Sequence, residues 1–83
     1  MSYEIAEKQA ATGVKQKALL DDLMFKNRVK NYAALAKLLG VAAPVISKSV
    51  TGKLVIGCNM ILRLHETFGV PVADIRTALA KYF

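Results

Sequence analysis

The feature that most constrains the fold is a helical apolar repeat that stops at Gly40 and restarts a few residues later. Asn31 can cap the first stretch, because its short side chain accepts a hydrogen bond from a free backbone N–H. Gly40 readily adopts the left-handed conformation that ends a helix. Ala43 and Pro44 open the second stretch, where proline is tolerated because first-turn N–H groups have no helical partner. The pattern predicts two short helices joined by a tight turn.

Apolar residues at three- and four-residue intervals predict three more helices around this pair. They run over about 14–27, over 57–68 and from Pro71 onward, so we expect an all-α domain of five helices over residues 14–83. Residues 1–13 have few large apolar groups, and we expect them to form a flexible or loosely helical arm. The side chains expected to be buried include Leu19, Leu20, Leu23, Met24, Ala34, Leu35, Leu38, Leu39, Val45, Ile46, Val50, Cys58, Ile61, Leu62, Leu64, Phe68, Val72, Ile75, Leu79 and Tyr82.

Composition favours one small folded domain. The 83 residues are 54% hydrophobic, which argues against general disorder. The single cysteine, Cys58, cannot form an internal disulfide, so we expect a small buried apolar side chain in a reducing cytoplasm. No uncharged run approaches the ~18 residues that a membrane helix needs, so we expect no membrane partner.

Charge is distributed unevenly along the chain. Residues 23–65 contain seven Lys or Arg residues and no Asp or Glu, and the whole chain has a net charge of +6. The seven are Lys26, Arg28, Lys30, Lys37, Lys48, Lys53 and Arg63. A pair of helices joined by a tight turn inside an acid-free segment indicates DNA binding.

Several positions carry a family resemblance. Ala36 stands where two helices would cross closely, Gly40 lies in the turn, Ile46 lies on the inner side of the second helix, and Gly52-Lys53 follow it. The runs 62–66 and 69–72 suit the fourth and fifth helices of the same pattern. With these marks, the chain from about residue 19 to 79 resembles the lambda-repressor-like, or Cro-type, helix-turn-helix domains of phage and bacterial regulators. The resemblance implies a five-helix bundle with its third helix in the major groove.

The resemblance also implies roles for particular residues. The groove-facing residues would be Ala43, Pro44, Ser47, Lys48 and Thr51. Lys53 and the loop behind it would contact phosphates. Backbone N–H groups around Gly57 and Cys58, at the start of the fourth helix, would bind another phosphate, and Tyr32 would contact the DNA backbone on the other side.

Two features leave alternatives open. Ser49 stands where the family usually has an apolar residue, so the rotation of the third helix is open at this point. The groove face is also chemically poor, because only Ser47, Lys48 and Thr51 can hydrogen-bond to base edges. We therefore expect much of the affinity to come from phosphates and part of the specificity from DNA shape.

The leading interpretation is a sequence-specific regulator of double-stranded DNA, a phage- or prophage-type repressor that occupies an operator. The alternative is a protein-interaction module, such as an antitoxin, an anti-repressor or a host-takeover protein. We find no catalytic constellation, metal cluster or phosphate loop, and we expect no enzyme activity, cofactor or small-molecule ligand. Tyr82 and Phe83 leave two aromatic rings near the end of the fifth helix, which predicts a homodimer through that helix.

Overall fold

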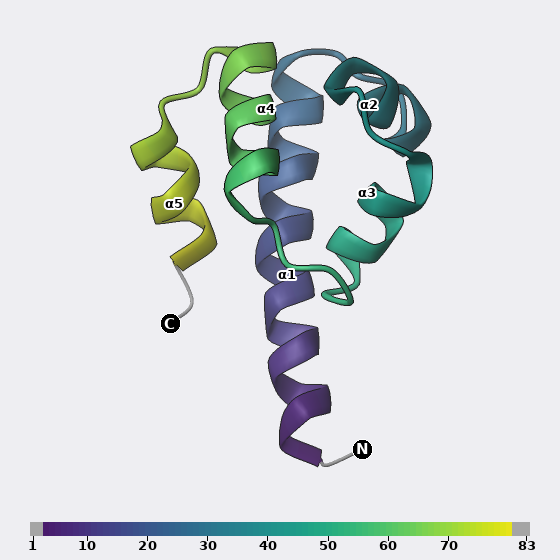
Figure 1. Cartoon of the computed structure of the whole chain (residues 1–83), viewed down its shortest axis with the longest axis vertical. Helices are drawn as coiled ribbons and strands as arrows, with labels where there is room; N and C mark the ends of the chain where they lie inside the picture. Colours follow the sequence, from purple (N-terminus) through teal and green to yellow (C-terminus); the bar gives the residue numbers. More distant parts are fainter. Residues whose placement is uncertain (1–2, 81–83) are drawn as a thin grey trace.

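The computed structural model describes the backbone of residues 3–80 and the side chains of residues 10–80. Within this range the chain forms five helices and no strand, which confirms the all-α prediction. The helices are α1 (Tyr3–Lys26), α2 (Tyr32–Leu39), α3 (Ala43–Val50), α4 (Cys58–Phe68) and α5 (Val72–Ala80) (Figure 1). α1 runs the length of the molecule, with α2 and α3 on one side and α4 and α5 on the other (Figure 1).

The hydrophobic core joins all five helices. Its fully buried members are Leu20 of α1, Leu35 of α2, Ile46 of α3, Leu64 of α4 and Ile75 of α5. Burial of a Leu or Ile side chain stabilises a fold by about 1.5–3 kcal/mol. The other buried apolar side chains are Leu19, Leu23, Met24, Ala36, Leu39, Ile56, Met60 and Ile61.

Some predicted core positions are wrong. Leu38 and Leu62 were expected inside but are 56% and 49% exposed, and Ala36 and Met60 are buried near them instead. Each helix residue advances about 100° around the axis, so only part of a continuous apolar run can face the core. The prediction for Tyr82 lies outside the described residues.

The start of α1 also differs from the prediction. Residues 3–13, for which the sequence predicts a flexible or loosely helical arm, continue the same helix as residues 14–26. Gly13 lies where α1 meets the end of α3: a Cβ built on it would lie 2.7 Å from the Thr51 carbonyl carbon and 2.9 Å from the Gly52 nitrogen. Close backbone approach, rather than a helix break, explains this glycine.

The predicted turn between α2 and α3 is confirmed. The Asn31 side chain accepts a hydrogen bond from the Ala34 N–H at 2.8 Å, and Gly40 has a left-handed φ of 71°. The Val41 N–H donates to the Ala36 carbonyl at 3.0 Å, which closes the end of α2. Across this three-residue turn the chain bends by 118°, within the ~90–120° of a helix-turn-helix unit.

No single helix within residues 3–80 is both long and apolar enough to cross a membrane. α2 and α3 reach that length and composition only when they are counted together across their bend.

Candidate nucleic-acid interface

The rotation of α3 about its axis is fixed by two buried residues. Ile46 and Ser49, three positions apart, are both fully buried. The Ser49 hydroxyl donates to the Val45 carbonyl at 2.8 Å, and this internal bond makes a buried hydroxyl tolerable. Ser49 therefore takes an inward place, and its burial together with Ile46 fixes the rotation that the sequence left open.

The opposite face of α3 is a continuous exposed stripe. All five residues expected to face the groove are exposed: Ala43, Pro44, Ser47, Lys48 and Thr51. They recur at intervals of three and four residues, which places them on one side of the helix. The Thr51 hydroxyl lies 3.2 Å and 3.1 Å from the Ser47 and Lys48 carbonyls, to which it donates. Its only proton is thus used within the helix, and Ser47 and Lys48 are the remaining side-chain donors of the stripe.

A buried glutamine holds α3 and the following loop against α1. The Gln16 Nε2 donates to the Ser49 carbonyl at 2.6 Å and to the Leu54 carbonyl at 2.8 Å, and its Oε1 accepts the Ile56 N–H at 2.6 Å. Both amide protons and the amide oxygen are therefore used. Gln16 thereby ties the last turn of α3 and the loop to α4 to α1.

Sequence reasoning missed Gln16. The available signal was its position four residues before Leu20 and seven before Leu23, on the core-facing side of α1. A polar side chain at such a position must find buried partners.

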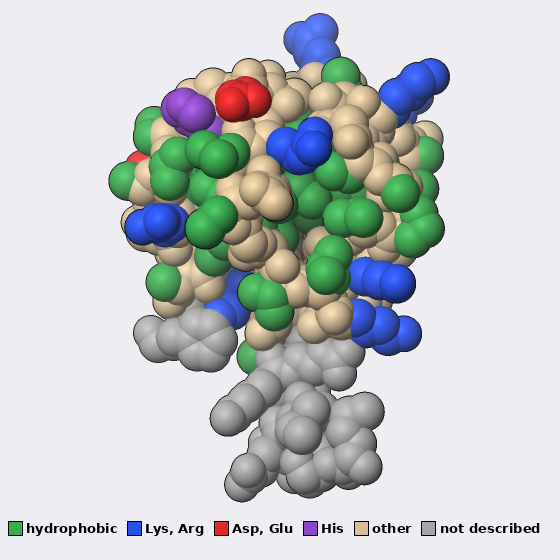
Figure 2. All heavy atoms as spheres, in the orientation of Figure 1, with side chains coloured by type: hydrophobic (Ala, Val, Ile, Leu, Met, Phe, Trp, Pro, Cys, Tyr) green, Lys and Arg blue, Asp and Glu red, His purple; other side chains and the backbone are tan. Residues whose placement is uncertain are grey.

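The loop between α3 and α4 is partly apolar. Lys53 is exposed, as expected, but the residues behind it, Leu54 and Val55, are also 39% and 70% exposed. Together with Val41, Val45 and other residues of α3 and α4, they line a groove of about 410 Å³ between these helices. Figure 2 shows hydrophobic side chains gathered in this hollow. The charged side chains around the loop are Lys53, Arg63, which lines this groove, and Lys15, which lines a smaller hollow with Val55 and Ile56.

The first turn of α4 is open to solvent. Gly57 caps the helix with extended backbone, and a Cβ built on it would meet nothing within 4 Å. Cys58 is exposed, so the expectation that it is a buried apolar group is wrong. The inward face of α4 is set by Met60, Ile61 and Leu64, and Cys58 lies about 200° around the helix from Met60. Backbone N–H groups at an exposed helix start attract anions.

Tyr32 takes part in a contact within the protein. Its hydroxyl donates to Asp21 Oδ1 at 2.8 Å, and Lys17 forms an ion pair with the other oxygen of the same carboxylate. Burial, followed by the hydrogen bond to Asp21, raises the pKa of Tyr32. Burial alone would raise the pKa of Asp21, but the hydrogen bonds from Lys17 and Tyr32 outweigh it and lower that pKa. The Tyr32 hydroxyl already links α2 to α1 through Asp21, so a phosphate contact, as predicted, would have to use the same hydroxyl.

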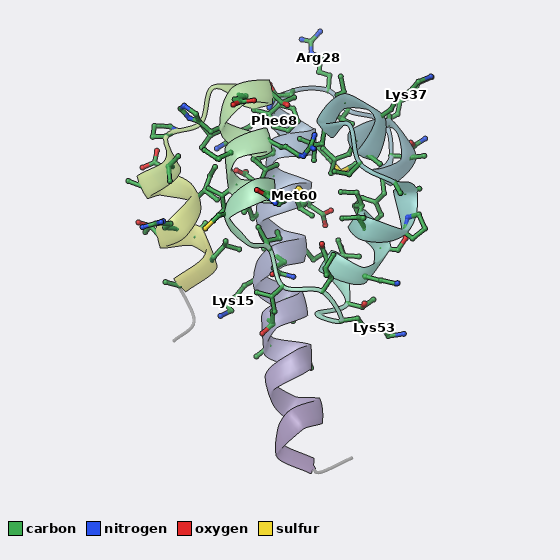
Figure 3. The ribbon with its side chains drawn as sticks, in the orientation of Figure 1. Lys15, Arg28, Lys37, Lys53, Met60 and Phe68 are labelled. Carbon is green, nitrogen blue, oxygen red and sulfur yellow. The ribbon has the colours of Figure 1, made fainter. Side chains whose placement is uncertain are left out.

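The acid-free segment leaves several cations without a carboxylate. Among the described residues, Lys26 pairs with Asp22 at 3.0 Å, and Arg63 donates to the Leu39 carbonyl at 2.9 Å. The other five cations of residues 23–65 are exposed and form no ion pair within residues 10–80: Arg28, Lys30, Lys37, Lys48 and Lys53. In Figure 3, Arg28 and Lys37 project from the end of the bundle at the α1–α2 connection, and Lys53 projects beyond the other end of α3.

Eight of the nine predicted site residues are therefore exposed, and the ninth, Tyr32, is half-buried. The structure places four of them on α3 and Thr51 at its C-cap, with Lys53 just after that helix and Gly57 and Cys58 at the start of α4. The chain matches no protein-family model, no curated protein and no solved structure.

Proposed function

We propose that the chain is a sequence-specific, double-stranded DNA-binding regulator with a lambda-repressor-like bundle, and that α3 enters the major groove. The observation that carries this proposal is the orientation of α3. Ile46 and Ser49 are fully buried, so the opposite stripe from Ala43 to Thr51 faces solvent without a carboxylate. The 118° bend before α3 and the exposed face of this short helix support such a role.

The exposed groups divide into readers and anchors. Ser47 and Lys48 would hydrogen-bond to base edges, and Ala43 and Pro44 would contact a thymine methyl group. Lys53 and the first-turn N–H groups of α4 would bind phosphates, which positions the domain but carries no sequence information. By occupying an operator, such a domain would act as a phage- or prophage-type repressor.

A single domain of this size contacts few base pairs, so we propose that it binds as a symmetric homodimer through α5 and the residues after it. Tyr82 and Phe83, on which this expectation rests, lie outside the described residues. Light scattering and footprinting on the full chain and on a chain truncated after Ala80 test it. The full chain should protect two half-sites about one helical turn apart. A truncated chain that still dimerises would rule out this interface.

Selection of bound duplexes from a random DNA library tests the function directly. The proposal predicts a defined motif, which would be symmetric for a dimer. Binding to the selected duplex should weaken steeply with salt, by about 0.9 in log K per log salt for each phosphate neutralised. Lys53→Ala should weaken binding to selected and random duplexes alike. Lys48→Ala should in addition reduce the preference for the selected duplex, by ~1–3 kcal/mol if the contact is well formed. A salt slope near zero would refute DNA binding.

The second candidate is a protein-interaction module, such as an antitoxin, an anti-repressor or a host-takeover protein. The observation in its favour is that only Ser47 and Lys48 of the α3 stripe keep side-chain protons for base edges, since Thr51 donates to its own helix. If the selection yields no motif while the chain remains folded, this candidate replaces the first.

A further inference from the structure

A second surface lies at the end of the bundle away from Lys53, where α1 connects to α2 (Figure 3). It is a groove of about 490 Å³. Its lining combines apolar and basic side chains: Asn27, Arg28, Val29, Lys30, Ala34, Lys37 and Leu38. None of these residues belongs to the DNA-facing set proposed above. We define the basic-apolar surface as Phe25, Arg28, Val29, Lys30, Lys37 and Leu38.

Two apolar members of this surface, Phe25 and Leu38, do not pack in the core, whereas Val29 packs against it. Phe25, on the last turn of α1, is 87% exposed, and Leu38, on the last turn of α2, is 56% exposed. Their neighbours Met24 and Leu39 supply the buried side chains at these helix ends. Phe25 is not among the residues that line the groove; it lies three residues before Arg28, which lines it. Exposed aromatic and aliphatic side chains beside a groove mark binding surfaces, and aromatic residues and Arg are enriched in them.

The charged part of the surface favours an anionic partner. Arg28, Lys30 and Lys37 are exposed, and no carboxylate lines the groove. The nearest carboxylates in sequence, Asp21 and Asp22, are engaged with Lys17 and Lys26 of the same helix. A partner with acidic groups opposite these three cations would have complementary charge, and its apolar side chains could contact the apolar residues of the groove.

We propose that the basic-apolar surface binds an acidic, amphipathic segment of another protein. Its apolar side chains would enter the groove at Leu38 and contact Phe25, and its carboxylates would face Arg28, Lys30 and Lys37. This proposal goes beyond DNA binding and does not depend on it.

Three other occupants fit the surface less well. DNA backbone would use the cations but would leave Phe25 and Leu38 without apolar contacts. A bilayer surface is broad and offers no side chain to fill a concave groove. A second copy placed symmetrically would bring the same three cations against themselves, which is unfavourable.

The probe is a phage-displayed library of random linear peptides, selected on the immobilised full chain. Selections run in parallel on the Phe25→Ser/Leu38→Ser variant and on a Lys37→Glu variant. Matched controls are Val55→Ser, which removes an apolar side chain that is 70% exposed elsewhere, and Arg76→Glu, which reverses an exposed charge on α5. All changes fall on exposed side chains, where effects on stability are small, and circular dichroism verifies the fold.

The proposal predicts enriched peptides that combine Asp or Glu with Leu or aromatic residues. A synthetic copy of one such peptide should bind the surface variants at least about tenfold more weakly than the wild type, equivalent to about 1.4 kcal/mol. The Val55 and Arg76 controls should bind it unchanged.

Three results would overturn the proposal. The first is no enrichment, or enrichment that survives in the surface variants. The second is a loss of duplex DNA affinity in Lys37→Glu as large as that in Lys48→Ala, which would assign the surface to DNA. The third is binding to phosphatidylserine vesicles that disappears in the surface variants, which would assign it to membrane lipid.

Discussion

Gly13→Ala should destabilise the protein, although alanine is the better helix former. Gly13 lies inside α1 and is buried against the end of α3. A Cβ at this position would lie 2.7 Å from the Thr51 carbonyl carbon, 2.9 Å from the Gly52 nitrogen and 3.0 Å from the Thr51 oxygen. Carbon atoms in contact normally lie about 3.5–4.0 Å apart, so the two backbones would have to separate.

Two opposing terms set the size of the effect. Replacing glycine by alanine in a helix interior gains about 1 kcal/mol from propensity. Overpacking a tight site costs about 1–3 kcal/mol, and the upper part of that range applies here because the opposing atoms are backbone rather than a flexible side chain. The net loss should be about 1–2 kcal/mol, and each kcal/mol lowers Tm by about 4–8 °C in a domain of this size.

Thermal and urea unfolding of the Gly13→Ala variant measure this loss. Ala18→Gly is the matched control, because Ala18 is exposed on the same helix and reports propensity alone. A Gly13→Val variant should be less stable still, since its side chain is larger. If Gly13→Ala raised Tm by as much as Ala18→Gly lowers it, propensity would dominate and the inferred close contact would be refuted.

Three further changes probe other contacts. Gln16→Leu should leave the Leu54 carbonyl and the Ile56 N–H without partners, and the Ser49 carbonyl with the Gly52 N–H alone. It should cost at least about 2 kcal/mol in urea unfolding, with faster exchange of the Ile56 amide proton; unchanged exchange would contradict this role. Arg28 has a left-handed φ of 56°, which glycine adopts without strain. Arg28→Gly should therefore raise the free energy of unfolding by about 0.5–1 kcal/mol in urea unfolding, while Arg28→Ala should not raise it. The pKa of Asp21 is lowered from its ordinary value of 3.8, because the hydrogen bonds from Lys17 and Tyr32 outweigh burial. Its contribution to stability should therefore be complete above that value and disappear as the pH falls through the lowered pKa. Melting wild type and Asp21→Asn in parallel from neutral to acidic pH tests this, and a Tm difference that does not narrow in acid would argue against it.

The local pattern of the sequence was sufficient for most helix ends. Asn31 caps α2 and Gly40 ends it with a left-handed φ of 71°, both as predicted. The helix expected over residues 57–68 ends at Gly69, which has a left-handed φ of 69°. These features depend on interactions within a few residues, so the chemistry of each residue type determines them. The buried stripe of α1 from Leu19 to Met24 was also predicted correctly, because it follows the period of a single helix.

Tertiary packing decided the rest. The sequence could not show that Gly13 lies inside a helix, because the reason is backbone from Thr51 and Gly52. It could not show that Ser49 is buried or that Gln16 bonds to atoms 33–40 residues away. The exposure of Cys58 likewise follows from how α4 packs on its neighbours. Periodicity predicts which face of a single helix is buried. It does not predict which distant segment packs against that face, or which polar groups of that segment need hydrogen-bond partners, because the core brings these segments together only in the folded protein.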